Sequence, residues 1–521
     1  MILAYSAASD PAASDPAASD PAASNLAAYF LDANLPVRRD KVALRYRDEA
    51  WTFGEMAEAS CRYGTHLRAL GVREEDRVLL ALDDTPDFAM AWFGVVRIGA
   101  VVAMMNPGVP PKDWAYYLRY TRARVLVTTT AFAEANASAI EEALGRQLSA
   151  VIRVDADRDL IRARSAECPY GDTGPDDPAV WLFSSGSTGA PKACVHVAQD
   201  FIFNTEMYAK QVLGIREDDV TLGVPKLFFG YATGTNLMFP WAVGATTCLF
   251  SERATVDEVI ANIERFHPTI VTNVPTMIHR MLEHPRCDTM DLSSIRLVLS
   301  AGEALPAELY TRWMKRTGVE ILDGIGSAEL FHIYITNFPG DVRVGTLGKL
   351  VPGYEAKIVG DDELPVPAGE IGTLWVKGPS NAICYHQDRA KSRVTYRGEW
   401  TTTGDQFCQD ADGFFVYCGR ADDLLKVGGV FVSPAEVENC LLTHEAVREC
   451  AIVGVEREGL TTTVAFVVAT RAGDDALGRA LQEHVKSRLA PHKYPRSVRF
   501  LDVLPRNDRG KVARAELKRL C

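Results

Sequence analysis

The 521-residue chain has no cysteine pair spaced as C-x-x-C, although it contains 11 cysteines. Zinc sites and dithiol redox sites commonly use that spacing, so the sequence gives no support to either kind of site. Cysteines that are scattered and odd in number are typical of thiols kept reduced in the cytosol. We therefore expect a cytoplasmic protein.

The chain also has fewer basic than acidic residues. Lysine and arginine total 56 against 68 aspartate and glutamate residues, which gives a formal net charge of −12. A nucleic-acid partner needs concentrated positive charge opposite its phosphates, so this balance argues against nucleic-acid binding. It leaves open a small anionic ligand in a local basic pocket.

A long, uninterrupted apolar run is missing as well. The most hydrophobic stretch, residues 88–105, is interrupted by Arg97 and Gly99, and a central arginine is costly in a bilayer. We interpret this stretch as a buried helix that passes into a strand, and we expect no membrane partner. The N-terminus also lacks the basic start of a secretory signal.

The first residues form a low-complexity segment. Residues 7–21 repeat Ala-Ala-Ser-Asp-Pro three times, and such a sequence has no apolar face to bury. We expect residues 1–24 to be a disordered tail that carries no chemistry.

The length exceeds one ordinary hydrophobic core, so two or more domains are expected. Helical patterns such as 53–70 alternate with short apolar runs such as 78–82, which predicts an α/β fold of layered, largely parallel sheets. From about residue 340, glycine-rich turns separate short strands instead. The sequence thus predicts a large N-terminal domain over 25–419, with a small β-subdomain at about 340–419.

The sequence pattern of the last part of the chain is typical of a compact α+β unit. Helical patterns cover roughly 434–443 and 475–489, and strand patterns cover 450–455 and 463–468. We predict a small, mobile α+β C-terminal domain over 420–521.

The segment SSGSTGAPK, residues 184–192, follows the apolar run 180–183 directly. Glycines let backbone N–H groups approach a phosphate, hydroxyls add donors and Lys192 adds positive charge, so the loop suits a triphosphate. It is not a Walker A loop, which needs G-x-x-x-x-G-K-[ST]. In isolation, such a segment could equally be a flexible linker.

Further distinctive segments follow in a fixed order: SAGEALP (300–306), DGIGSAE (323–329), GTLWVKGP (372–379), WTTTGD (400–405), GRADDLLKVGG (419–429) and LPRNDRGKVAR (504–514). The series resembles the adenylate-forming superfamily of acyl-CoA synthetases, peptide-synthetase adenylation domains and luciferases. The resemblance covers roughly residues 26–518. The segments KLFFGY (226–231) and DGIGSAELFHIYITN (323–337) look most like the benzoate and 2-aminobenzoate CoA ligases.

The resemblance implies an acid–thiol ligase that uses ATP, Mg²⁺ and coenzyme A. An aromatic carboxylic acid and ATP would form an acyl-AMP and pyrophosphate, and the acyl group would then pass to a thiol. Lys511 would bridge the substrate carboxylate and the α-phosphate. Glu329, with Thr188, would bind Mg²⁺, and Lys192 would contribute charge at the phosphates.

The resemblance gives nucleotide contacts to a larger set: Ser184, Ser185, Gly186, Ser187, Thr188, Gly189, Lys192, Gly302, Glu303, Ala304, Asp323, Gly324, Ile325, Ala328, Asp405, Tyr417, Arg420 and Lys511. Asp405 and Arg420 would hold the ribose hydroxyls. Ala328 departs from the family pattern, which has threonine there. Losing one hydrogen bond to a phosphate costs about 1.5–3 kcal/mol, unless Ser327 or a water compensates, so slower adenylation is implied rather than inactivity.

The acid pocket implied by the resemblance is flat and aromatic, and it suits a benzene ring better than a fatty chain. Its predicted walls are Phe229, Gly230, Tyr231, Ala301, Gly326, His332 and Ile333. His332 would orient the carboxylate or bond an ortho substituent, unless it is a structural histidine. Gly230 would leave room for an ortho group, which places 2-aminobenzoate level with or slightly ahead of benzoate, and salicylate behind both.

The thiol-transfer step implies rotation of the C-terminal domain about a hinge at Asp422. Gly428, Gly429 and Phe431 would lie against the pantetheine arm of coenzyme A, where missing Cβ atoms allow close approach.

Two alternative functions stay open on the sequence, and so does the oligomeric state. The thiol could belong to the pantetheine arm of a carrier protein rather than to free coenzyme A, for which Arg457, Lys493 and Arg496 are the candidate basic surface. Ala328 would also suit a degenerate protein that binds an adenylate without turnover. A homodimer formed through the large domain is a further possibility.

Overall fold

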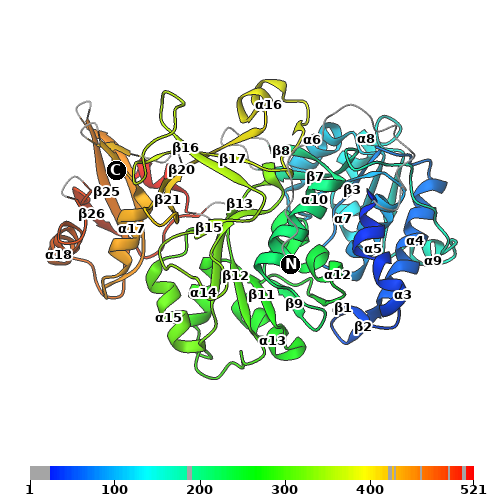
Figure 1. The fold of residues 1–521 in the computed structure, drawn as a ribbon, viewed down its shortest axis with the longest axis horizontal. Helices are drawn as coiled ribbons and strands as arrows, with labels where there is room; N and C mark the ends of the chain where they lie inside the picture. The colour runs from blue at the N-terminus through cyan, green and yellow to red at the C-terminus, as the bar shows by residue number, and fades with distance from the viewer. Residues whose placement is uncertain are drawn as a thin grey trace, which may run out of the picture.

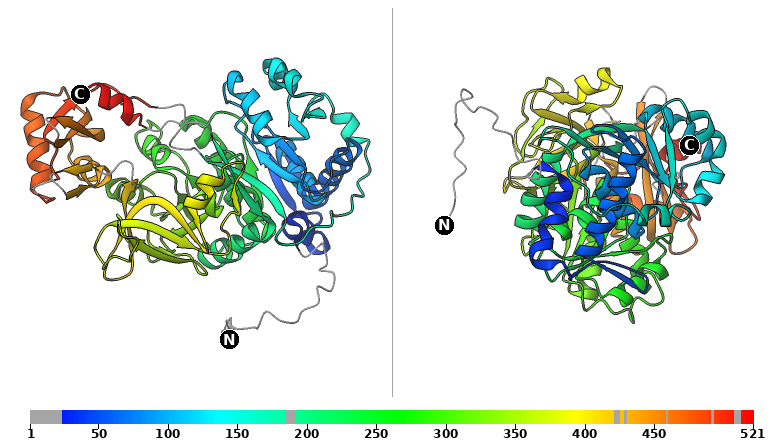
Figure 2. Two further views of the ribbon diagram at one scale, coloured as in Figure 1. Left: turned by 90° about the horizontal axis from the view of Figure 1, so that it is seen from above. Right: turned by 90° about the vertical axis from the view of Figure 1, so that its right-hand side faces the viewer.

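The computed structural model describes residues 24–184, 191–420, 425–427, 430–457, 460–490, 493–506 and 512–521. Layered sheets and helices form a large body, and the described residues between 425 and 521 lie beside it as a smaller lobe (Figures 1 and 2, orange to red). The predicted α/β class is confirmed, because the two largest sheets have mainly parallel strands at their centres.

The first sheet has nine strands within the described ranges, in the order β15 (Lys349–Leu350), β14 (Ile333–Thr336), β13 (Ile321–Gly326), β12 (Leu297–Ser300), β11 (Ile270–Asn273), β9 (Val220–Gly223), β10 (Thr246–Leu249), β1 (Val42–Tyr46) and β2 (Glu49–Thr52). The six strands from β13 to β1 are parallel to their neighbours, whereas β2, β14 and β15 pair antiparallel at the edges.

The second sheet has seven strands in the described part of the chain, in the order β18 (Cys384–Tyr385), β8 (Lys192–Val197), β7 (Pro178–Ser184), β4 (Val101–Met104), β3 (Arg77–Leu80), β5 (Val125–Thr128) and β6 (Ala150–Arg153). Alternate side chains on its strands enter two different cores, as the two-residue period of a strand requires. Val78 and Leu80 face the core between the two large sheets, whereas Leu79 faces the core under α6 and α8.

Helices connect and cover these sheets: α2 (Leu26–Phe30), α3 (Leu35–Arg38), α4 (Phe53–Ala69), α5 (Pro86–Arg97), α6 (Pro111–Thr121), α7 (Thr130–Ala135), α8 (Ala137–Ala143), α9 (Arg158–Arg162), α10 (Ala198–Asn204), α11 (Gly230–Thr233), α12 (Phe239–Ala242), α13 (Val256–Phe266), α14 (Pro275–Leu282) and α15 (Ala307–Thr317). Local sequence explains where α4 begins, because Thr52 and Glu55 form a reciprocal capping box.

The hydrophobic stretch 88–105 folds as predicted, with α5 passing into β4. Arg97 is buried at the end of α5 and forms a 2.5 Å ion pair with Asp32. Its charge is therefore compensated inside the core, as a buried charge requires. Among the described residues, no helix combines the length and apolar character that a bilayer crossing needs.

A third sheet is formed by the region after about residue 340, where glycine-rich turns separate short strands. It contains β16 (Glu355–Val359), β17 (Gly372–Lys377), β20 (Trp400–Gln409), β19 (Tyr396–Arg397) and β21 (Phe415–Arg420), and α16 (Arg389–Thr395) precedes β19. The short strands predicted in this region are confirmed.

The smaller lobe contains β22 (Leu425–Val427), β23 (Val430–Val432), α17 (Pro434–Leu442), β24 (Val447–Arg457), β25 (Leu460–Ala469), α18 (Asp475–Lys486), β26 (Ser497–Phe500) and α19 (Arg514–Arg519). The predicted helices and strands of this region are confirmed, with α18 ending three residues earlier than expected. Two clusters of buried apolar side chains contain residues of this lobe alone. The domain boundary near Arg420 stays a prediction.

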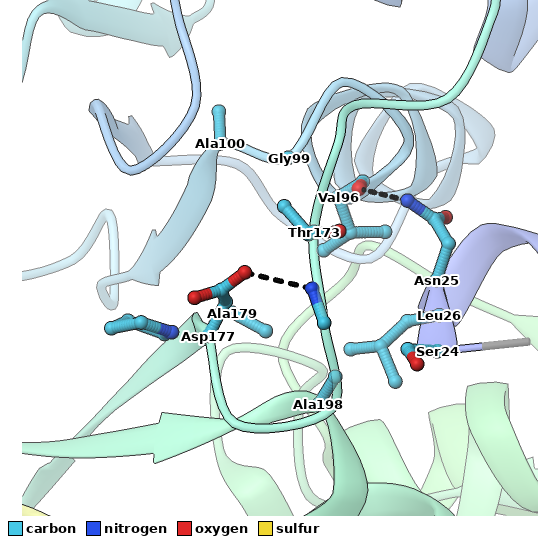
Figure 3. A pocket seen from close by; sticks show the side chains of 12 residues that line it. Ser24, Asn25, Leu26, Val96, Gly99, Ala100, Thr173, Asp177, Ala179 and Ala198 are labelled. Carbon is cyan, nitrogen blue, oxygen red and sulfur yellow. Dashed lines mark hydrogen bonds between the residues drawn. The ribbon is translucent and has the colours of Figure 1, made fainter. Parts of the chain in front are cut away.

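A small cavity of about 20 Å³ lies beside α2 and α5 (Figure 3). Asn25 donates to the carbonyl of Val96 at its edge, and the amide of Gly174 donates to Asp177. This volume admits about one water molecule, so the cavity is a packing detail rather than a substrate site.

Candidate active site

The ends of the predicted phosphate loop are held together by an antiparallel strand pair. Ser184 closes β7, Lys192 opens β8, and the two residues are partners in the register. The Lys192 ammonium lies 4.0 Å from the Asp388 carboxylate and over the ring of Tyr385. The remaining predicted loop residues lie outside the described residues: Ser185, Gly186, Ser187, Thr188 and Gly189.

Glu329 lies in a single 3-10 turn, η4 (Ala328–Leu330), which connects β13 to β14 and packs against β7. The hydroxyl of Tyr385 donates to Oε1 of Glu329 at 2.7 Å, and the amide of Ala382 donates to the Glu329 carbonyl at 2.9 Å. Burial and the adjacent carboxylate raise the pKa of Tyr385 far above its ordinary value. The phenol therefore remains a donor to Glu329 at any physiological pH.

The same turn is anchored from the opposite side by a buried histidine. His196 Nε2 donates to the carbonyl of Ala328 at 2.6 Å, and His196 Nδ1 lies 2.7 Å from Oδ2 of Asp200. Both side chains are almost completely buried. The backbone that presents Glu329 is therefore held by β8 and α10 as well as by its own strands.

Asp405 and Arg420 are brought together by the β20–β21 pairing. They are partners in the register, and Arg420 Nη1 donates to Asp405 Oδ1 at 3.1 Å. Burial raises the pKa of Tyr334, and the charges of Asp405, Glu329 and Arg420 all act on it. Residues from three separate motifs thus converge around one buried phenol, Tyr334 of β14. Tyr417, on the same strand as Arg420, packs its ring against Phe407.

The predicted adenine residues follow β12 and run along β13. Ser300 and Asp323 are partners in the register of these parallel strands. Oδ1 of Asp323 has no hydrogen-bond partner among the described residues, and burial raises its pKa to about 8. A buried, unpaired carboxyl oxygen needs a donor, which the amino group of an adenine can supply.

The segment after β12 contains Gly302, Glu303 and Ala304. Glu303 Oε2 accepts from both the amide and the hydroxyl of Thr276, at 3.0 and 2.6 Å, in the first turn of α14. Its side chain therefore fixes the position of this segment. On β13, a Cβ at Gly324 would approach the carbonyl of Ile335 to 2.8 Å, so glycine allows β13 and β14 to pair closely beside Ile325.

The predicted acid pocket combines an exposed aromatic residue with buried ones. Phe229, the residue before α11, is 48% exposed and packs against Phe228. The hydroxyl of Tyr231 is buried without a hydrogen-bond partner in the described chain. Ala301 and Ile333 are buried, and a Cβ at Gly326 would lie 2.4 Å from the carbonyl of His332.

His332 is neutral in this environment. Burial lowers its pKa to about 3, and Nε2 donates to the carbonyl of Tyr231 at 3.0 Å. Since Nε2 carries the proton, Nδ1 is an acceptor, and it has no partner among the described residues. The rings of Tyr208, Tyr231 and Phe239 surround it.

Several predicted residues of the C-terminal part cannot be placed. Lys511, Asp422, Gly428 and Gly429 lie outside the described residues, and for Phe431 only the backbone, in β23, is described.

Sequence reasoning missed three residues of this site: Tyr385, Tyr334 and His196. Tyr385 bonds Glu329 across 56 residues of sequence, and His196 bonds Ala328 across 132. Tyr334 is near Glu329 in the chain but far along it from Asp405 and Arg420. A tyrosine directly after the last apolar residue of a short strand was the only local signal for Tyr385, and that pattern is common.

Comparison with known proteins places this chain in a family. Residues 31–386 match the AMP-binding enzyme family, and residues 436–511 match the AMP-binding enzyme C-terminal domain. The chain is 41% identical over 484 residues to a benzoate–CoA ligase of Thauera aromatica, which covers 91% of this chain and 92% of that protein.

Two solved structures resemble this chain across nearly the whole fold. The anthranilate CoA ligase AuaEII in complex with anthranoyl-AMP has a TM-score of 0.90 at 39% identity, covering 94% of this chain and 96% of that one. A benzoate CoA ligase from Burkholderia xenovorans LB400 has a TM-score of 0.87 at 40% identity, covering 95% and 99%. The resemblance inferred from the motifs is thus confirmed, and this chain belongs to the AMP-binding enzyme family.

Proposed function

We propose that this protein is an aryl-acid:CoA ligase that uses ATP and releases AMP and pyrophosphate. One observation carries the proposal: the short connection between β13 and β14 presents Glu329 toward the phosphate-loop strands and His332 toward an aromatic cluster, three residues apart. A charged group that suits a nucleotide and an apolar site lined by aromatic rings are therefore presented by the same short connection. The benzoate and anthranilate ligases that the chain resembles support the same reaction.

In the first half-reaction, an oxygen of the aryl carboxylate attacks the α-phosphorus of ATP, and pyrophosphate leaves. Lys192 and the loop that it follows are proposed to hold the β- and γ-phosphates, and Lys511 to bridge the two reacting anions. Asp405 and Arg420 are proposed to hold the ribose, with Asp323 receiving the adenine amino group. These roles are the ones that the resemblance to the ligase family implies, and the charge of each side chain suits its proposed role.

The Glu329 carboxylate fits a magnesium site. Mg²⁺ on a nucleotide usually takes one or two protein carboxylates and completes its shell with phosphate oxygens and water. Tyr385 donates to Oε1 of Glu329, and this one hydrogen bond leaves lone pairs on the carboxylate for a ligand. Bound there, the ion would offset the charge of the triphosphate.

In the second half-reaction, a thiol attacks the acyl carbonyl and AMP leaves. Free coenzyme A is the proposed acceptor, and a carrier-protein pantetheine arm is the alternative. Of the candidate basic residues, Lys493 forms a 2.6 Å ion pair with Glu436, and Arg496 lies over the ring of Tyr494. The positive charge of Lys493 is thus already neutralised. Of these two residues, Arg496 is therefore the better candidate for binding the nucleotide part of coenzyme A.

The proposed acid is benzoate or 2-aminobenzoate. Gly230 does not provide the open space expected of it, because a Cβ there would lie 3.1 Å from Leu182 and 3.3 Å from the Phe331 carbonyl. The neutral His332 favours an ortho donor instead. Its unpaired Nδ1 can accept from an amino group but would repel a carboxylate oxygen.

The test is to incubate the purified protein with ATP, Mg²⁺, coenzyme A and a mixture of benzoate, 2-aminobenzoate, salicylate and a medium-chain fatty acid, and to identify products by mass spectrometry. An aryl-CoA is expected. An aryl-AMP without thioester would favour a carrier-protein acceptor. No acid-dependent ATP–pyrophosphate exchange would overturn the proposal and favour a degenerate adenylate-binding protein.

A further inference from the structure

Two cysteines face each other across the strand pair that carries Asp405 and Arg420. Cys408 lies on β20 and Cys418 on β21, and their sulfur atoms are 4.0 Å apart. The register shifts next to them, because Gln406 pairs with Gly419 while Phe407 pairs with Tyr417. Cys418 is therefore the extra residue of a β-bulge, a feature that re-aims a side chain.

The two thiols differ in exposure and acidity. Cys418 is buried, whereas Cys408 is partly exposed. The Cys418 thiol donates to the Cys408 sulfur, and this hydrogen bond lowers the pKa of Cys408 to about 7. Burial instead raises the pKa of six other described cysteines: Cys61, Cys194, Cys248, Cys384, Cys440 and Cys450. The hydrogen bond with Cys408, together with burial, raises the pKa of Cys418. Among the cysteines whose pKa is shifted, Cys408 is thus the one best prepared to react as a thiolate.

We propose that Cys408 and Cys418 form a modification site, a dithiol that a low-molecular-weight disulfide oxidises to an intramolecular disulfide. The Cys408 thiolate attacks one sulfur of the small disulfide, and one small thiolate leaves. The Cys418 sulfur then attacks Sγ of Cys408, the second small thiolate leaves, and the Cys418 proton passes to solvent or to that leaving group. Two protein thiols lose two electrons in total, and the small disulfide is reduced to two thiols.

The geometry requires only a local change. A disulfide has sulfur atoms about 2.05 Å apart, so the two sulfurs must approach by roughly 2 Å, which side-chain rotation and a small strand shift can supply. The bond would tie β20 to β21 beside the register shift. It would therefore alter the positions of Asp405 and Arg420, which lie three and two residues from the cysteines.

The site also lies at the junction with the smaller lobe. Helix α17 packs against β21, and the charges of Glu436 and Lys493 act on the pKa of Cys408. These two residues form an ion pair with each other. Oxidation would thus act on the nucleotide contacts and on the packing of the lobe together. The expected loss of activity rests on the proposed function, whereas formation of the disulfide does not.

The first test treats the full-length protein with oxidised glutathione and counts free thiols by alkylation and peptide mapping. We expect two of the 11 thiols to be lost and a cross-linked species containing Cys408 and Cys418, reversed by dithiothreitol. C408S and C418A should each abolish the cross-link. C287S, which removes a half-buried cysteine elsewhere, should leave it unchanged. Full alkylation of both cysteines after treatment, or cross-links through other cysteines, would overturn the site.

The second test measures acid-dependent ATP–pyrophosphate exchange on the same samples. Oxidation of the wild type should lower exchange roughly tenfold, because misplacing a positioning group by about 1 Å can cost up to 10²-fold, and reductant should restore it. Exchange by C408S should not respond to the oxidant. A cross-linked wild type with full exchange would overturn the coupling to nucleotide binding. Reduced protein without any exchange would count against the proposed function and not against the thiol site.

Discussion

The nucleotide side and the acid side of the proposed site are built in opposite ways. On the nucleotide side, the charged groups proposed for the phosphates and the ribose already have partners: Arg420 donates to Asp405, Tyr385 donates to Glu329, and Lys192 faces Asp388. These pairs hold the charges in place before a ligand arrives, so little reorganisation is needed when the triphosphate binds. Asp323, proposed for the adenine, is the exception, because its Oδ1 has no partner among the described residues.

On the acid side, the polar groups His332 and Tyr231 are neutral, and each has one side-chain atom without a partner in the part of the chain that the structure describes. His332 Nδ1 and the Tyr231 hydroxyl are buried with no hydrogen-bond partner among the described residues, inside a cluster of aromatic rings. Leaving such groups unpaired costs about 1–3 kcal/mol each, a cost that a ligand with a matching group removes. We infer from this comparison that the proposed nucleotide side supplies catalytic charge and the proposed acid side supplies selectivity.

The largest loss of activity is expected when charge is removed from the nucleotide side. Glu329→Gln keeps the side-chain shape but loses the carboxylate proposed to bind Mg²⁺. We expect ATP–pyrophosphate exchange to fall by about 10²–10³-fold, as for loss of one electrostatic contact to a transition state. Glu141→Gln, an exposed position, is the matched control. Equal rates for the two variants would show that Glu329 is not part of the site.

The next effect probes selectivity on the acid side. His332→Leu removes the unpaired acceptor and keeps an apolar side chain. Turnover of 2-aminobenzoate should fall by roughly 10–100-fold, the equivalent of one buried hydrogen bond, while turnover of benzoate changes much less. Competition between the two acids in one assay measures the ratio. An unchanged ratio of the two turnover rates would mean that His332 does not bind the ortho substituent.

A smaller effect is expected from the hydrogen bond that holds Glu329. Tyr385→Phe removes only the hydroxyl, and a hydrogen bond to a charged group contributes about 1.5–3 kcal/mol. Exchange should fall about tenfold, mainly through a higher Mg²⁺ requirement. Tyr46→Phe, which removes a hydroxyl bonded to Ser251 at the far edge of the first sheet, should leave the Mg²⁺ dependence unchanged. A loss that saturating Mg²⁺ does not relieve would argue against a positioning role.

The smallest effect concerns pH and stability. The pKa of Asp323 is raised from 3.8 to about 8, so the folded state binds this proton more tightly than the unfolded state. Stability from this group is therefore present at low pH and is lost progressively as pH rises toward and through 8. Between pH 6 and pH 9, Asp323→Asn should lose less thermal stability than the wild type, with a shift in Tm of about 1 °C per kcal/mol for a domain of this size. A parallel decline of both proteins would contradict the raised pKa.

Local patterns predicted much of the fold. The helix expected over 53–70, the interrupted apolar run that becomes α5 and β4, and the short strands after residue 340 all depend on neighbours in sequence. The same is true of the motif residues Asp405 and Arg420, although their pairing depends on the β20–β21 register. The contact between Tyr385 and Glu329 spans 56 residues, and no periodic pattern signals it.

The sequence by itself determined the family, the order of the strands and helices, and the kinds of residue available for binding a nucleotide. These follow from short-range backbone preferences and from the residue types in each motif. Only the tertiary structure decided which of those residues meet and in what state. Assembly of the sheets buried His332 and Asp323 and moved their pKa values in opposite directions on the pH scale, since burial disfavours the charged form of each. The same assembly placed the sulfur atoms of Cys408 and Cys418 in contact, although their spacing in the chain gave no indication of a dithiol.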